Sequence, residues 1–205
     1  MFDQPTRHVE SVQLLIQCGA DVTARDNTNS TPLHLASSRR QTESMRLLIQ
    51  HGADVNARRD EGNSTPLHLA SSWILAGPVQ LLIQHGADIN ARDKDDSTPL
   101  HLAAMSNTES MRLLIQHGAD VNARDKSNST PLHLVSSLWK RRFARVCLLL
   151  EHGANAGAKD DMGRTPDEVA LSNSGRISPE IARLISDHRN RAREIIVRGS
   201  RDVVP

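Results

Sequence analysis

Apolar side chains recur along the chain as short stripes with the spacing of a helix face. Met45, Leu48 and Ile49 have the i, i+3, i+4 spacing that places them on one side of a helix. Gly52 follows at the point where a left-handed residue commonly ends a helix. The pattern therefore predicts a short amphipathic helix that ends just before this glycine.

A second, shorter helix is predicted ahead of the stripe. Thr31 is placed as an N-cap and Pro32 as the first helical residue, while Leu33, Leu35 and Ala36 form the packing face. The segment that follows each apolar stripe is rich in Asp, Asn and Gly, which predicts an extended, hairpin-like loop. One period therefore consists of a helix, a turn, a second helix and a loop.

This period repeats in register along the chain. Thr-Pro-Leu-His-Leu begins at Thr31, Thr65, Thr98 and Thr130, at spacings of 34, 33 and 32 residues, and a degraded copy begins at Thr165. The glycine that closes each apolar stripe recurs in phase, at Gly19, Gly52, Gly86, Gly118 and Gly153. Two landmarks in phase over five copies indicate an internal repeat.

A period near 33 residues that carries Thr-Pro-Leu-His and Gly-Ala-Asp-Val-Asn-Ala resembles the ankyrin repeat, over roughly residues 8–188. The resemblance implies an all-α solenoid of stacked helix-turn-helix units with short hairpin loops, because one unit cannot bury its apolar face alone. The predicted units are a truncated N-terminal repeat at 1–25, ankyrin repeats at 26–58, 59–92, 93–124 and 125–159, a divergent C-terminal capping repeat at 160–188 and a basic tail at 189–205.

Two departures from the family pattern bear on function. The first copy begins only at about His8, in alignment with the second helix, and residues 1–7 stand where a first helix is expected. Either the chain is a piece of a longer array, or this helix pairs with something outside the chain. The glycine that the family places in the turn between helices is replaced by Arg40, Ile74 and Asn107, which predicts altered turn geometry.

Composition and charge narrow the class of protein. Among 205 residues, 25 Lys and Arg balance 24 Asp and Glu, so no strong global attraction to nucleic acid or membranes is expected. Two Trp, two Phe and no Tyr predict a thin core of Leu, Ile, Val and Ala. The sequence shows neither a membrane-spanning stretch nor a secretory signal. Cys18 and Cys147 are expected to lie on the order of 40 Å apart as free thiols, which favours an intracellular, cytoplasmic or nuclear, location.

The histidines invite a catalytic or metal interpretation, but eight of the ten are repeat landmarks. Stacked helices lie about 8 to 10 Å apart, whereas zinc ligands converge at about 2.1 Å from one ion. The family resemblance implies instead that each tetrapeptide histidine binds the Thr hydroxyl and a neighbouring backbone group. Pairs such as His34 and Ser38 lack a third group and an oxyanion pocket. We therefore predict no catalytic residue, no metal, no cofactor and no small-molecule substrate.

The resemblance places a binding surface on the concave side, which is made by hairpin tips and first helices. Trp73 aligns with Arg39 and Ser106, so the stack does not require an aromatic side chain there, although Trp73 could also fill space in its own unusual turn. The predicted partner-binding residues are Arg39, Trp73, Met105, Leu138 and Trp139 along the first helices, and Arg59, Asp60, Glu61, Lys94, Asp95 and Lys126 at the tips.

A basic cluster offers a different class of function. It comprises Lys140, Arg141, Arg142 and Arg145, to which the C-terminal segment adds Arg189, Arg191, Arg193, Arg198 and Arg201. These side chains could meet an acidic partner or phosphates, or could simply form a solvated face. Phe143 is the one interleaved aromatic residue and provides no stacking platform for bases, so nucleic acid is not the expected partner.

The sequence thus predicts a non-catalytic, monomeric protein–protein interaction scaffold that binds another protein on its concave surface. One alternative is the target-recognition arm of a larger multidomain enzyme or signalling protein, of which this chain is a fragment. Another is anion or nucleic-acid binding through the basic C-terminal segment.

Overall fold

The computed structural model describes residues 4–138, 143–172 and 179–201, with the side chains of 8–138, 143–172 and 179–191, and within these ranges every regular element is a helix. The helices are α1 (Gln4–Gln17), α2 (Pro32–Ser38), α3 (Thr42–Gln50), the short 3-10 helix η1 (Glu61–Asn63), α4 (Pro66–Ser71), α5 (Gly77–Gln84), α6 (Pro99–Ser106), α7 (Thr108–Gln116), α8 (Pro131–Ser137), α9 (Phe143–Glu151), α10 (Pro166–Ser172) and α11 (Pro179–Arg201). The predicted all-α repeat fold is confirmed.

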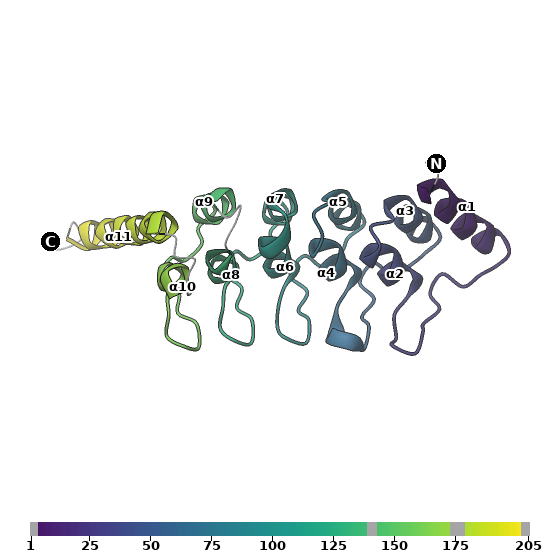
Figure 1. Ribbon diagram of the computed structural model, residues 1–205, viewed down its shortest axis with the longest axis horizontal. Coiled ribbons are helices and arrows are strands. Elements are labelled where there is room, and N and C mark those ends of the chain that lie inside the picture. Colours follow the sequence, from purple (N-terminus) through teal and green to yellow (C-terminus); the bar gives the residue numbers. More distant parts are fainter. Residues whose placement is uncertain (1–3, 139–142, 173–178, 202–205) are drawn as a thin grey trace. The chain divides into compact units, whose positions relative to one another are not determined.

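The chain divides into two compact units, Met1–Asp120 and Val121–Pro205. In the first unit α2, α4 and α6 pack in one row, and α1, α3, α5 and α7 pack in a second row beside it (Figure 1). In the second unit α8 packs on α10, and α11 packs on both α9 and α10. Each unit therefore consists of stacked helix pairs, as one amphipathic pair requires neighbours to cover its apolar face.

Leucine and alanine form a thin core between the two rows. Leu67, Leu82, Leu100 and Leu114 are fully buried in the first unit, as are Met45 and Met111. No aromatic side chain is buried in the described part of the chain. The thin aliphatic core expected from the composition is present.

The first helices α2, α4, α6 and α8 begin with the same capping arrangement. Thr31, Thr65, Thr98 and Thr130 have extended backbones, proline follows at the first helical position, and the histidine three residues on completes a capping box. The Thr hydroxyl accepts the backbone N–H of this histidine, and the imidazole accepts the N–H of the Thr. Two amides that a helix start would leave without acceptors are thereby satisfied.

Asparagine side chains connect each loop to the next copy. The Asn56 amide donates to the Gly86 carbonyl, and its oxygen accepts the N–H of Asp88. The same pair of bonds recurs at Asn90 and Asn122. In the first copy Thr23 takes this position, and its N–H and hydroxyl bond to Asp21 of the same loop. The boundary between the first two copies therefore lacks this bridge.

The two departures from the family pattern have definite structures. Helix α1 begins at Gln4, before the expected start near His8, because Pro5 falls in the first turn, where a missing N–H costs little. It packs on α3, in the row of second helices, as the alignment predicted. Arg40 has φ +61° and so keeps a left-handed turn without glycine, whereas Asn107 is extended and caps α7. The prediction of altered turn geometry is thus wrong at Arg40 and confirmed at Asn107, and Ile74 also lacks a left-handed backbone.

Helix α11 continues well past the last repeat. It runs from Pro179 to Arg201, so the position 188/189 that separates the predicted capping repeat from the basic tail lies inside one helix. Ser178 followed by Pro179 has the residue types of an N-cap and a first helical position, but Ser178 lies outside the described residues.

Candidate partner-binding surface

The tetrapeptide histidines are fully engaged in the fold. Their Nδ1 atoms lie 2.8 to 2.9 Å from the Thr hydroxyl oxygens of their own copies. Because Nδ1 also accepts the Thr N–H, the ring proton lies on Nε2. This Nε2 reaches the loop of the next copy, at the carbonyl oxygens of Ser64 for His34, Ser97 for His68 and Arg164 for His133. The hydrogen bonds implied by the family resemblance are confirmed.

The serines four residues after these histidines do not face the imidazoles. Ser38, Ser72 and Ser137 donate their hydroxyls to backbone carbonyls of their own helices. Within the described part of the chain, no group of three or more His, Cys, Asp or Glu side chains is placed to hold a metal ion. These hydrogen bonds do not place the imidazole as a base beside the serine hydroxyl in any of the three pairs.

The buried histidines make stability depend on pH. Burial lowers the pKa of His34, His68 and His133 below the ordinary value of 6.5. As the pH falls through this value the unfolded chain takes up protons that the folded chain refuses, so the stability present above it is lost. For three such groups we expect the free energy of unfolding to fall by about 2 kcal/mol between pH 7 and pH 6.

Urea titrations followed by circular dichroism at a series of pH values measure this loss. A free energy of unfolding that stays constant across the interval would show that these histidines protonate equally in both states.

Aspartates shape the hairpin tips from within. The Asp93 carboxylate accepts the backbone N–H groups of Asp95 and Ser97, and Asp26 and Asp125 do the same in their own loops. This leaves the side chains of Lys94, Asp95 and Lys126 exposed at the tips, where they were predicted to meet a partner.

The third copy, at 59–92, has a longer tip. Gly62, with φ +79°, accommodates one additional residue within η1. Asp60 is tied to the neighbouring tip, because its carboxylate accepts the Asn29 amide and its N–H donates to the Thr28 carbonyl. Arg59 is half-buried and lies 3.8 Å from the exposed carboxylate of Glu61. Of the three predicted residues, Glu61 is the one whose charge is exposed and not tied to the neighbouring tip.

Four large apolar side chains are exposed where α4 and α6 end, and we call them the apolar turn cluster. They are Trp73, 37% exposed, Ile74, 72%, Leu75, 51%, and Met105, 51%. The Arg40 guanidinium lies over the Trp73 ring, 5.1 Å from its centroid. Trp73 therefore keeps a substantial part of its ring at the surface. Sequence reasoning named Trp73 and Met105, but it did not identify Arg40, whose contact depends on the left-handed turn.

Hydrogen bonds from side chains to backbone carbonyls hold the turn that carries this cluster. The Ser106 hydroxyl donates to the Ser71 carbonyl, and the Asn107 amide donates to the Ile74 carbonyl. The turn after α4 is thus held on one side by α6 and on the other by Arg40. Residues held in this way lose little freedom when a partner binds.

Two of the basic residues, Arg145 and Arg189, belong to the fold and form neither a solvated face nor a free anion-binding surface. Arg145 is buried, so it does not present its charge to an acidic partner. Arg189 pairs with Asp167, with guanidinium-to-carboxylate distances of 2.9 and 2.8 Å, and so belongs to the fold. Trp139, Lys140, Arg141 and Arg142, and the side chains of Arg193, Arg198 and Arg201, lie outside the described residues. Leu138 is half-buried and Arg191 is exposed.

The two cysteines are free thiols. Cys18 is exposed at the end of α1, whereas Cys147 is half-buried on α9. Burial raises the pKa of the Cys147 thiol, and the charge of Glu151 adds to the effect. Cys147 is therefore the less accessible of the two thiols.

Comparison with known proteins identifies the repeat. A family model described as ankyrin repeats (3 copies) matches residues 5–93 and 74–160. No curated protein matches the chain. None of the described helices combines the length and the apolar character that crossing a membrane demands.

Proposed function

The chain belongs to the ankyrin-repeat family, and from this premise we propose that it is a non-catalytic scaffold that binds another protein through the apolar turn cluster. Ankyrin repeats are generally protein–protein interaction modules and are typically non-catalytic. The observation that supports this choice of surface is the exposure of Trp73 and Met105 beside Ile74 and Leu75. The repeats do not require large apolar side chains at these positions.

Trp73 is the expected anchor of the interface. Tryptophan is enriched among the few residues that dominate binding energies, because it buries a large rigid surface at a small entropic cost. The Arg40 guanidinium on one ring face orders the side chain before binding and leaves the exposed part for the partner. Arg39, exposed next to this turn, adds a charge at the rim.

The tips would set the orientation of the partner. Lys94, Asp95 and Glu61 are exposed charges in the first unit, and Lys126 is their counterpart in the second. Charges at the rim of an interface mainly steer association and suppress wrong registers, whereas a buried apolar anchor supplies affinity. Substitutions at the tips should therefore change the rate of association more than the rate of dissociation.

The test removes the anchor and leaves the fold. We expect Trp73→Ala to weaken partner binding by about 30-fold, which corresponds to the loss of one hot spot. The full chain is used as bait in quantitative affinity capture with mass spectrometry, and the dissociation constant is then measured for each protein that the wild type retains.

Met162→Ala is the matched control, because Met162 is an exposed apolar side chain of the second unit. Proteins retained by the wild type and by Met162→Ala but lost by Trp73→Ala would be partners of the cluster. Equal retention by all three, with unchanged circular dichroism, would exclude the apolar turn cluster as the binding site.

A further inference from the structure

Helices α3 and α7 have the same nine-residue sequence, Thr-Glu-Ser-Met-Arg-Leu-Leu-Ile-Gln, but they begin differently. In α7 the Asn107 side chain caps the helix, because its oxygen accepts the Glu109 N–H and its amide donates to the Ser110 hydroxyl, 3.1 Å away. In α3 the residue before the helix is Gln41, and its side chain forms no capping bond. The identical helix sequences therefore show what the capping residue contributes.

The start of α3 keeps polar groups that have no partner within the described residues. Ser44, the counterpart of Ser110, is only 1% exposed, and its hydroxyl oxygen forms no hydrogen bond with this part of the chain. The Glu43 N–H likewise has no capping acceptor among the described side chains. A buried hydroxyl without a partner is costly, so an acceptor that reaches it gains free energy. These unsatisfied groups follow from the glutamine at residue 41, where α7 has asparagine.

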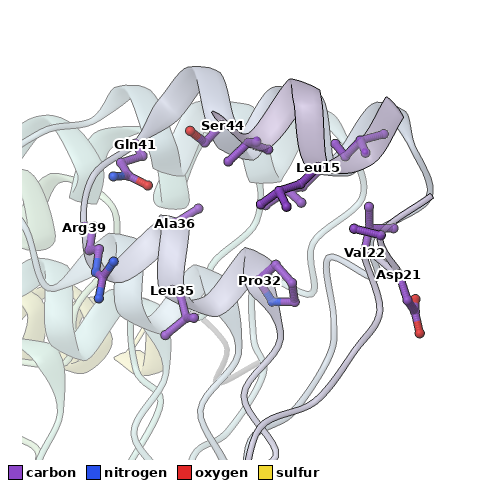
Figure 2. A pocket seen from close by; sticks show the side chains of 13 residues that line it. Leu15, Asp21, Val22, Pro32, Leu35, Ala36, Arg39, Gln41 and Ser44 are labelled. Atoms are coloured by element: carbon purple, nitrogen blue, oxygen red, sulfur yellow. The ribbon is translucent and has the colours of Figure 1, made fainter. Parts of the chain in front are cut away.

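A cavity of about 580 Å³ opens at this helix start. Its lining includes His8 of α1, Arg39 at the end of α2, and Gln41, Glu43 and Ser44. The pocket drawn in Figure 2 shares Arg39, Gln41 and Ser44 with this cavity, and the Ser44 oxygen is turned toward Gln41 there. The hydroxyl without a partner is therefore directed at the open end of α3.

The cavity also carries positive charge that the start of α7 lacks. Arg39-Arg40 stands before α3, whereas the uncharged pair Met105-Ser106 stands at the same place before α7. The N-terminus of a helix adds a partial positive charge of its own. The Glu43 carboxylate lies 3.5 Å from the Arg46 guanidinium, which offsets part of its repulsion for an anion. Unsatisfied donors and arginine thus occur together at one helix start and are both absent from the other.

We propose that the start of α3 binds a phosphate group, with the Glu43 N–H, the Ser44 hydroxyl and the Arg39 guanidinium as its donors. The phosphate oxygens take the place of the Asn107 side chain in α7, which lies within hydrogen-bond distance of the equivalent N–H and hydroxyl. Phosphate fits this site better than a carboxylate, because it offers three oxygens to three donors and carries a charge of about −2.

Nuclear magnetic resonance titration of the isotope-labelled full chain tests the proposal. The probes are inorganic phosphate, glycerol phosphate and N-acetyl-phosphoserine amide, with acetate and sodium chloride at matched ionic strength as references. We expect the Glu43 and Ser44 amide signals to shift saturably with phosphate and to stay in place with chloride. The probe that binds most tightly identifies the source as free phosphate, a small phosphorylated molecule or a phosphorylated side chain.

Ser44→Ala is expected to weaken phosphate binding about tenfold, which corresponds to the loss of one hydrogen bond to a charged group. Without phosphate this variant should be at least as stable to urea as the wild type, since the hydroxyl has no partner in the described chain. Ser110→Ala is the matched control on the identical helix and should bind phosphate as the wild type does.

Arg39→Gln is expected to weaken binding by about tenfold as well. Its control is Arg112→Gln, which removes the same charge from an exposed ion pair on α7 and should leave binding unchanged. Shifts that grow without saturation, equal binding by the wild type and Ser44→Ala, or acetate bound as tightly as phosphate would overturn the proposal. None of these variants alters Trp73, so the result is independent of the partner-capture test.

Discussion

Replacing His68 by Ala is expected to lower the free energy of unfolding by about 3 kcal/mol, because a buried hydrogen-bonding side chain is lost together with its volume. His68 is fully buried. Its Nδ1 accepts the N–H of Thr65 and its Nε2 donates to the carbonyl of Ser97 in the next copy. The substitution leaves the Thr65 N–H without its acceptor and the Ser97 carbonyl with only the bond from the Asp93 N–H.

Urea unfolding followed by circular dichroism measures the change. His85→Ala is the matched control, because this imidazole is exposed before the glycine that ends α5, and surface substitutions usually change stability by less than about 0.5 kcal/mol. If the two variants were equally stable, the repeated histidine would contribute only a helix cap that the solvent replaces.

Replacing Asp167 by Leu is expected to destabilise the second unit by about 3 kcal/mol, although it restores the leucine of the other copies. Asp167 forms two bonds with the Arg189 guanidinium and accepts the Thr165 hydroxyl. With the carboxylate gone, the guanidinium is left in a largely buried position without its counter-charge. The loss therefore comes from the uncompensated charge and not from packing.

The double variant Asp167→Leu with Arg189→Leu separates these causes. Since apolar residues often replace a buried ion pair without loss, we expect the double variant to recover to within about 1 kcal/mol of the wild type. Removing the exposed pair Glu43 and Arg46 should change stability by less than about 0.5 kcal/mol. Additive losses in the double variant would show that the pair is not coupled.

Local and periodic features were predictable from sequence. The N-caps, the prolines, the helix faces and the bonds of His34 all depend on residues a few positions apart, and repetition makes each signal recur. The register of Trp73 with Arg39 also followed from alignment of the copies. Most of the first unit could therefore be predicted before any coordinates were known.

The features that sequence reasoning missed depend on contacts between distant residues. Arg145 and Arg189 were grouped by charge, but burial and the carboxylate of Asp167 on another helix decide what they do. The contact of Arg40 with Trp73 requires a left-handed residue that propensity disfavours. The cavity at the start of α3 is visible only once the position of α1 is known.

Thr23 gives the first unit a preferred place to come apart. In a linear array each module is stabilised by its junctions with its immediate neighbours. Without an asparagine at residue 23, the junction between the first two copies lacks two side-chain bonds that the later junctions have. Helix α1 should accordingly fray at a lower free energy than α5 or α7, and amide exchange along the unit should slow from this end inward.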